Sequence, residues 1–202
     1  QMNRMNRILE VDTENLTAWV EPGVVTSDLH AAVEAIGLFY PPDPGSMTVS
    51  TLGGNVAENA GGLRGLKYGV TRDYVIGLEV VLPTGEVIAT GGKTVKNVTG
   101  SDLTKLMVGS EGTLGFITKI LVRLIPKPEA KKTMLVYYKT LDDAALTVSS
   151  IIAHRVIPPT LEFLDNVTIR CVEQYIKAGL PLDLDAILLI EVDGPGCVVD
   201  ED

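Results

Sequence analysis

The stretch from Thr51 to Gly62, Thr-Leu-Gly-Gly-Asn-Val-Ala-Glu-Asn-Ala-Gly-Gly, constrains this 202-residue chain more than any other. Two Gly-Gly pairs enclose small residues and two asparagines, with no lysine or arginine inside. The stretch offers few side chains for a core, so we interpret it as a loop whose backbone lies close to a flat or anionic ligand. Glycine allows positive φ and lacks the Cβ that would hold a ligand away. Consecutive exposed amides in such a loop form an anion-binding concavity, and a second glycine loop spans Gly109–Gly115.

The bulk properties exclude several classes of protein. An apolar fraction of 46% is ample for a core, and the length suits one large domain or one domain plus part of another. A net charge of −9 argues against nucleic acid and anionic membrane surfaces. No apolar run reaches the roughly 18 residues that a membrane span needs.

Cysteine and histidine are too sparse to suggest a framework or a metal site. Cys171 and Cys197 are widely separated, so we expect two reduced thiols. His30 and His154 are isolated, and we expect each on a helix surface or edge. With no secretory pattern at the start of the chain, we expect a cytoplasmic protein.

Local patterns predict a mostly antiparallel sheet with flanking helices in the first part of the chain. A helix opens at Thr26, has Leu29, Val33 and Ile36 on its apolar face, and stops at Gly37. Three prolines between residues 41 and 44 predict a rigid bend. Strands are predicted at residues 8–12, 17–23, 74–82, 86–90 and 116–125, and a short helix capped by Ser101 and Asp102 at residues 101–107.

After Pro126-Lys127-Pro128, where we place the domain boundary, the pattern changes to β-α-β-α-β. Thr140 caps a helix with Asp143 at N3, and Asp165 caps another that reaches Lys177. The strands are predicted at residues 133–139, 160–164 and 186–192. The chain then stops without a closing element, which would leave a sheet edge exposed, so we expect a piece of a longer protein.

The common nucleotide and catalytic motifs are missing from the sequence. Gly92-Lys93-Thr94 resembles the end of a Walker A loop, but the first glycine of that motif would stand at Val87. No G-x-G-x-x-G, G-x-S-x-G or H-E-x-x-H pattern occurs, and nothing favours a Ser-His-Asp triad. The sequence therefore predicts no catalytic residue and no metal ligand in this chain.

Five motifs together carry a resemblance to a known family. In order along the chain they are Pro41–Pro44, Thr51–Gly62, Leu66–Gly69, Gly91–Gly100 and Gly109–Gly115. This combination resembles the vanillyl-alcohol-oxidase-type (PCMH) FAD-binding domain, and most of all the family of glycolate oxidase D subunits and FAD-linked D-lactate dehydrogenases. The resemblance covers nearly the whole chain. It implies an α+β fold, with the second lobe of the FAD-binding domain at residues 1–128 and the first part of a ferredoxin-like cap domain at residues 131–202.

The resemblance also implies which residues contact FAD. The proline bend would line the ADP part, and the first glycine stretch would approach the pyrophosphate and the flavin edge. The second glycine loop would shape the ribose and adenine end. The predicted cofactor-binding residues are Pro42, Asp43, Pro44, Thr51, Leu52, Gly53, Gly54, Asn55, Asn59, Ala60, Gly61, Gly62, Glu111, Gly112, Gly115 and Ile117. A diphosphate held without lysine or arginine needs many backbone donors, which glycine-rich turns supply.

Each motif has a plainer interpretation when taken alone. Double glycines serve tight turns, Pro41–Pro44 suits a rigid linker, and Glu111 suits a surface charge.

By the resemblance, the parent protein is an FAD-dependent 2-hydroxyacid dehydrogenase that passes a hydride from the α-carbon of a small hydroxy acid to flavin N5. Its electrons would then go to a partner subunit or carrier.

The family's other pyrophosphate loop would precede residue 1, and its substrate-binding histidines would follow Asp202. For the isolated chain we therefore favour the alternative function, an inactive and flavin-free fragment. Its truncated edges suggest that it associates with itself. A nucleotide-binding module that takes no flavin is a third hypothesis.

Overall fold

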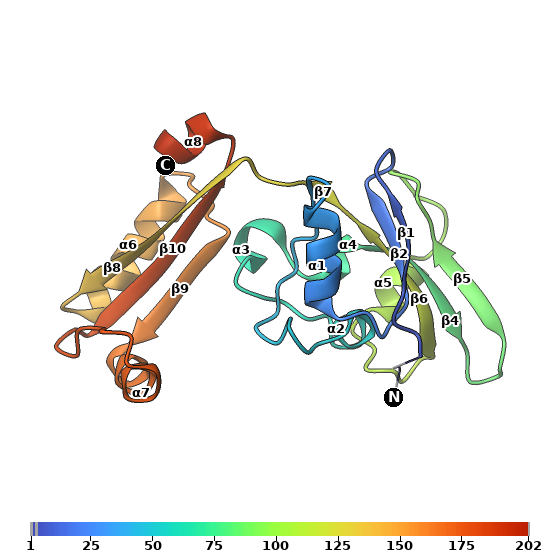
Figure 1. The fold of residues 1–202 in the computed structure, drawn as a ribbon, viewed down its shortest axis with the longest axis horizontal. Coiled ribbons are helices and arrows are strands. Elements are labelled where there is room, and N and C mark those ends of the chain that lie inside the picture. The colour runs from blue at the N-terminus through green and yellow to red at the C-terminus, as the bar shows by residue number, and fades with distance from the viewer. Residues whose placement is uncertain (1, 3, 202) are drawn as a thin grey trace. The chain divides into compact units, whose positions relative to one another are not determined.

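The computed structural model describes residue 2 and residues 4–201, and the chain divides into two compact units (Figure 1). The first unit ends at Lys127 and the second begins at Pro128. Both units combine antiparallel strands with helices, so the predicted α+β class is confirmed.

An antiparallel five-stranded sheet in the order β1-β2-β6-β4-β5 forms the frame of the first unit. Its strands are β1 (Ile8–Asp12), β2 (Thr17–Val20), β4 (Val75–Val81), β5 (Val87–Gly91) and β6 (Phe116–Arg123). A separate pair joins β3 (Leu38–Phe39) to β7 (Ile125–Pro126). The predicted single strand at residues 116–125 is therefore two strands, since β6 pairs with β2 and β4 whereas β7 pairs with β3.

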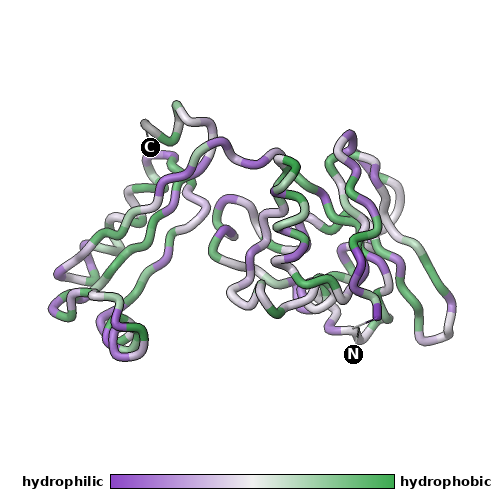
Figure 2. The backbone as a smooth tube through the Cα atoms, viewed as in Figure 1, coloured by the Kyte–Doolittle hydropathy of each residue, from purple (hydrophilic) through white to green (hydrophobic). Residues whose placement is uncertain are grey.

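Short helices and apolar strand residues together build the core of this unit. The helices are α1 (Thr26–Glu34), α2 (Leu52–Glu58), α3 (Gly65–Tyr68), α4 (Thr71–Tyr74) and α5 (Leu103–Met107). One cluster joins the sheet through Val20, Leu78 and Ile120 to Leu29 of α1 and Val56 of α2, all fully buried. In Figure 2 the turn between β1 and β2 is hydrophilic, whereas the strands carry hydrophobic segments.

Helix α1 differs from its prediction at two residues. It ends at Glu34, and Ile36, predicted on its buried face, is 50% exposed because it lies beyond the last turn. His30, predicted on a helix surface or edge, is buried, and its Nε2–H donates to the carbonyl oxygen of Pro42 at 3.0 Å. The histidine therefore attaches α1 to the proline bend.

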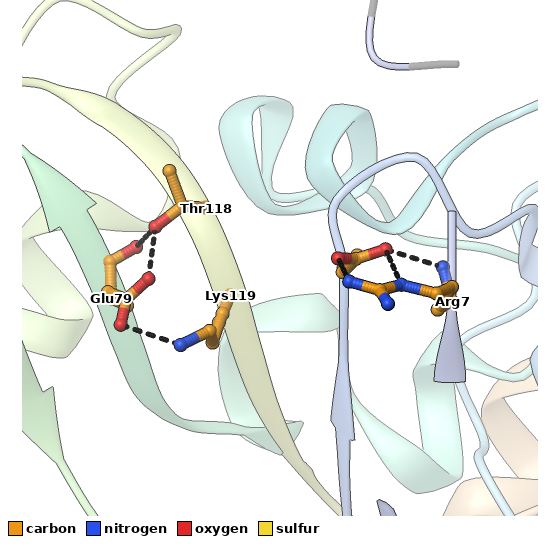
Figure 3. A network of polar contacts seen from close by, with 5 residues as sticks. Arg7, Glu79, Thr118 and Lys119 are labelled. Carbon is orange, nitrogen blue, oxygen red and sulfur yellow. Dashed lines mark hydrogen bonds and ion pairs between the residues drawn. The ribbon is translucent and has the colours of Figure 1, made fainter. Parts of the chain in front are cut away.

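Two polar networks tie neighbouring strands together (Figure 3). Glu79 of β4 accepts from Thr118 Oγ1 at 2.8 Å and from Lys119 Nζ at 2.9 Å, both on β6. The buried carboxylate of Glu21 accepts from the backbone N–H of Arg7 at 2.8 Å and from its guanidinium at 2.8 and 3.2 Å. This bidentate pair fixes the segment that leads into β1.

We expect the Glu21–Arg7 pair to make the first unit sensitive to acid. Hydrogen bonds from the side chain and then the backbone of Arg7 hold the pKa of Glu21 below its ordinary value of 4.5. Because the folded pKa is the lower one, the stabilisation is complete above about pH 4.5 and disappears as the pH falls through the folded value. Glu21→Gln should therefore lower the Tm at neutral pH but not in acid, whereas Glu14→Gln, in the exposed turn after β1, should change neither. Equal melting of Glu21→Gln and the unmodified chain at neutral pH would contradict this.

The second unit is a three-stranded antiparallel sheet in the order β8-β10-β9 with helices between its strands. Its elements are β8 (Ala130–Tyr138), α6 (Leu141–Ala153), β9 (Thr160–Asp165), α7 (Asn166–Ile176), β10 (Ala186–Gly194) and α8 (Gly196–Glu201). Thr140 and Asp165 cap α6 and α7 as predicted, each accepting from the N3 amide. Helix α8 corrects the expectation that no element follows the last strand; Asp202 lies outside the described residues. No helix in the described part of the chain is long and apolar enough to cross a membrane.

Candidate functional site

Most of the first glycine stretch, Leu52–Glu58, is helix α2 rather than a loop. Thr51 is the N-cap of α2, and Asn59 ends the helix in the left-handed conformation with φ 53°. Leu52, Asn55 and Val56 form one buried face, and the two apolar side chains are fully buried. The interpretation that this stretch has little to bury was wrong, because its i, i+3, i+4 spacing places the few larger side chains on the same side.

The first amides of α2 already donate to acceptors within the protein. Leu52 N–H donates to Val24 O and Gly53 N–H to Pro22 O, both at 2.8 Å. Gly54 N–H donates to Thr51 Oγ1 at 3.3 Å. A Cβ at Gly53 would lie 2.6 Å from Pro22 Cβ, so this glycine serves close packing. In this arrangement these three amides are engaged and do not supply donors for a diphosphate.

The two asparagines of this stretch have different surroundings. Asn55 is buried, and its Nδ2 donates to Thr26 Oγ1 at 2.8 Å, which links α2 to α1. Asn59 is half-buried, and its Oδ1 accepts from Arg72 N–H at 2.8 Å. Since the side-chain oxygen of Asn59 is engaged, its NH₂ group is the part that can donate to a ligand.

The proline bend lies against the end of the same stretch. A Cβ at Gly62 would overlap both the carbonyl oxygen and the carboxylate of Asp43, so Gly62 lets the two segments meet. Arg64 N–H donates to Asp43 Oδ1 at 3.1 Å, and Arg64 Nε lies 3.4 Å from Asp43 Oδ2. Burial raises the pKa of Asp43, and the hydrogen bond and positive charge of Arg64 oppose that rise.

The second glycine loop docks on the C-terminal half of α2. Gly109 N–H donates to Val56 O at 2.8 Å, and Glu111 N–H to Ala57 O at 3.0 Å. Glu111 is exposed and left-handed, with φ 52°. The loop then runs into β6, where Ile117 pairs with Val80 and a Cβ at Gly115 would lie 2.6 Å from Val80 Cγ1.

The structure thus brings α2, the loop at residues 109–112 and the proline bend into one region, while Gly115 and Ile117 extend from it along β6. Within this region Gly61, Gly62 and Gly112 are exposed. Their amides have no protein acceptor among the residues that the structure describes. A Cβ at Gly112 would meet no atom within 4 Å, and one at Gly61 would meet only the side chain of Val70. Open backbone of this kind fits a ligand that approaches the main chain, as the diphosphate of FAD would.

Two arginines of this region were missed by sequence reasoning. Arg64 is separated from the second Gly-Gly pair by Leu63 alone, and this closeness was its only signal in the sequence. Arg72 donates through Nη2 to Val108 O at 2.7 Å and through its backbone to Asn59, so it joins α2, α4 and the second glycine loop. Nothing in the local sequence indicates this role for Arg72.

A cavity of about 400 Å³ lies elsewhere in the first unit, between the ends of β4 and β5, the segment that follows β5, and α5. It is lined by Val75, Ile76, Ala89, Thr90, Gly91, Gly92, Thr94, Val95, Asn97 and residues 99–105. Lys93, the lysine of the Walker-like triplet, donates to Glu10 at 2.9 Å and to Asp12 at 2.7 Å. Because this lysine is paired with two carboxylates, the structure agrees with the rejection of a P-loop.

Comparison with known proteins gives matches in both parts of the chain. The family described as FAD binding domain matches residues 1–91, and FAD linked oxidases, C-terminal domain, matches residues 127–202. Glycolate oxidase subunit GlcD of Bacillus subtilis is 64% identical over 98% of this chain and 42% of its own length. D-lactate dehydrogenase of Anaerostipes hadrus is 42% identical over 96% of this chain and 42% of its own length.

A solved structure of alkyldihydroxyacetonephosphate synthase is similar, with a TM-score of 0.82 and 26% identity over 98% of this chain and 39% of that one. The chain thus spans about 40% of the length of the relatives it matches. The two family matches and the high identity to full-length relatives agree with the resemblance inferred from the glycine motifs. The chain is therefore similar to an FAD binding domain over its first part and to the C-terminal domain of FAD linked oxidases over its second.

Proposed function

We propose that this chain forms part of the FAD site of an FAD-dependent 2-hydroxyacid dehydrogenase of the glycolate oxidase type. The observation that carries the proposal is the open glycine backbone at Gly61, Gly62 and Gly112, brought together in a chain whose first part matches an FAD binding domain. Bound FAD would supply the redox chemistry, which for this class of enzyme is hydride removal from the α-carbon of a small 2-hydroxy acid to flavin N5.

The residues of the first unit would hold the cofactor through main-chain groups. The amides of Gly61, Gly62 and Gly112 would donate to the diphosphate, and the NH₂ of Asn59 to a further acceptor on the ligand. Pro42–Pro44 would form the wall beside the ADP part. Leu52, Gly53 and Asn55, which are occupied in packing or internal hydrogen bonds, would support this surface from behind.

The relatives and the sequence support the remaining assignments of the proposal. We assign residues 1–128 to the second lobe of the FAD-binding domain and residues 131–202 to the beginning of the cap domain. A relative is named as a subunit of glycolate oxidase, which supports a partner subunit or carrier as the acceptor of electrons. The free thiols of Cys171 and Cys197 support a reducing compartment such as the cytoplasm.

Ligand competition tests the proposal against its alternatives. The purified chain is titrated with FAD, following flavin fluorescence, and then with ATP as competitor. We expect weak, saturable FAD binding that ATP displaces only poorly, because this surface offers only part of the diphosphate donors. A colourless chain that leaves FAD fluorescence unchanged would support the flavin-free alternative, and tighter binding of ATP would support a different nucleotide site.

A further inference from the structure

Arg64 makes an unusual set of contacts at the edge of the proposed cofactor site. Its backbone N–H and its guanidinium both face the carboxylate of Asp43, so one residue serves both carboxylate oxygens. The two side chains are 23% and 10% exposed. A carboxylate this buried is costly unless it is paired, and Arg64 is the cation that pairs with it.

The guanidinium also lies over an aromatic ring. Its central carbon lies 4.8 Å from the centre of the Phe39 ring, a cation–π contact with β3. Phe39 in turn packs edge-on against Tyr68 of α3, with ring centres 5.8 Å apart. Arg64 therefore joins β3, the proline bend and the segment after Gly62, and the Phe39 ring limits where its charge can move.

The charge of Asp43 matters because of its position. Asp43 lies in the bend that would flank the ADP part of FAD, and its backbone touches Gly62. An unpaired carboxylate beside a diphosphate would repel it, and this repulsion is strong where water is largely excluded. His30, whose Nε2–H donates to the carbonyl oxygen of the neighbouring Pro42, is a further titratable group that acts on Asp43, and burial lowers the pKa of His30.

We propose that Arg64 is a positioning residue for the cofactor, which acts through Asp43 by neutralising its carboxylate and fixing the bend against Gly62. This inference rests on the proposed function and goes beyond it, because it gives the diphosphate site a cation that does not touch the ligand. With the carboxylate of Asp43 neutralised by Arg64, the proline bend is compatible with an anionic ligand beside it.

Charge-specific variants separate this role from simple support of the fold. FAD affinity is measured by titration for the unmodified chain, Arg64→Gln, Arg64→Lys, Asp43→Asn and the double variant Arg64→Gln/Asp43→Asn. We expect Arg64→Gln to weaken FAD binding about tenfold and Arg64→Lys to restore part of the loss. The double variant should bind within about twofold of Asp43→Asn, because removing the carboxylate removes the need for its partner. Lys96→Gln removes one positive charge from an exposed residue, as a matched control for Arg64→Gln, and should not change FAD affinity.

A second readout needs no cofactor. The pKa of Asp43 is followed by ¹³C NMR in the folded chain, and we expect it to rise in Arg64→Gln and to stay near the unmodified value in Arg64→Lys. An unchanged pKa in Arg64→Gln, or a double variant as weak as Arg64→Gln, would overturn the inference. If the unmodified chain does not bind FAD at all, the proposed function itself fails, and the inference fails with it.

Discussion

Replacing Gly62 with alanine is expected to separate the proline bend from the segment after α2. The new Cβ would overlap the carbonyl oxygen and carboxylate of Asp43, and backbone atoms cannot rotate away as a flexible side chain can. Overpacking of this kind costs about 1–3 kcal/mol, and here it also breaks the contact between Asp43 and Arg64. We therefore expect a lower Tm and loss of FAD binding in Gly62→Ala, measured by thermal unfolding and by flavin fluorescence.

A neighbouring glycine provides the matched control. Gly65 is the first residue of α3, and a Cβ there would meet no atom within 4 Å. Gly65→Ala should leave FAD binding intact and stabilise the chain by up to about 1 kcal/mol, since alanine favours a helix over glycine. If the two variants melted and bound alike, the close approach of Gly62 to Asp43 would not be a feature of the folded protein.

The largest loss of stability is expected from Leu78→Ala. Leu78 lies in β4, between β5 and β6, and is fully buried in the main cluster of the first unit. Removing a buried leucine side chain typically costs about 2–5 kcal/mol, because the cavity that remains closes only partly. We expect the loss in amide protection measured by hydrogen exchange to spread over β4, β5 and β6.

An exposed residue on the neighbouring strand β5 provides the control for this prediction. Val87 in β5 is 62% exposed, so Val87→Ala should change the free energy of unfolding by no more than about 0.5 kcal/mol. The second unit has its own clusters, around Leu188 and around Ile169, and its amide protection should remain in Leu78→Ala. If Leu78→Ala were as stable as Val87→Ala, Leu78 would not be a core residue.

Features set by neighbours in the sequence were predicted well. The caps at Asp102, Thr140 and Asp165 depend on a side chain that bonds to an amide three residues on, so the local sequence contains both partners. The alternating strands and the change of pattern near Pro128 were also visible, because both follow from periodicity and proline placement.

Features that depend on distant residues were not predictable in the same way. The burial of His30 requires Pro42 to return beside α1, and the pairing of Asp43 with Arg64 joins residues that are 21 positions apart. The helix at α2 was missed for another reason. Its glycines are poor helix formers, and they obscured the spacing of Leu52 and Val56, whose burial in the core outweighs that propensity.

The most direct test of the account is to locate FAD on the folded chain from its amide NMR signals. As FAD is added to saturation, we predict that the signals of Gly61, Gly62 and Gly112 shift together with one dissociation constant, while those of residues 92–102 stay unchanged. Shifts confined to the cavity beside α5, or none at saturating FAD, would contradict the claim that open glycine backbone around α2 receives the cofactor.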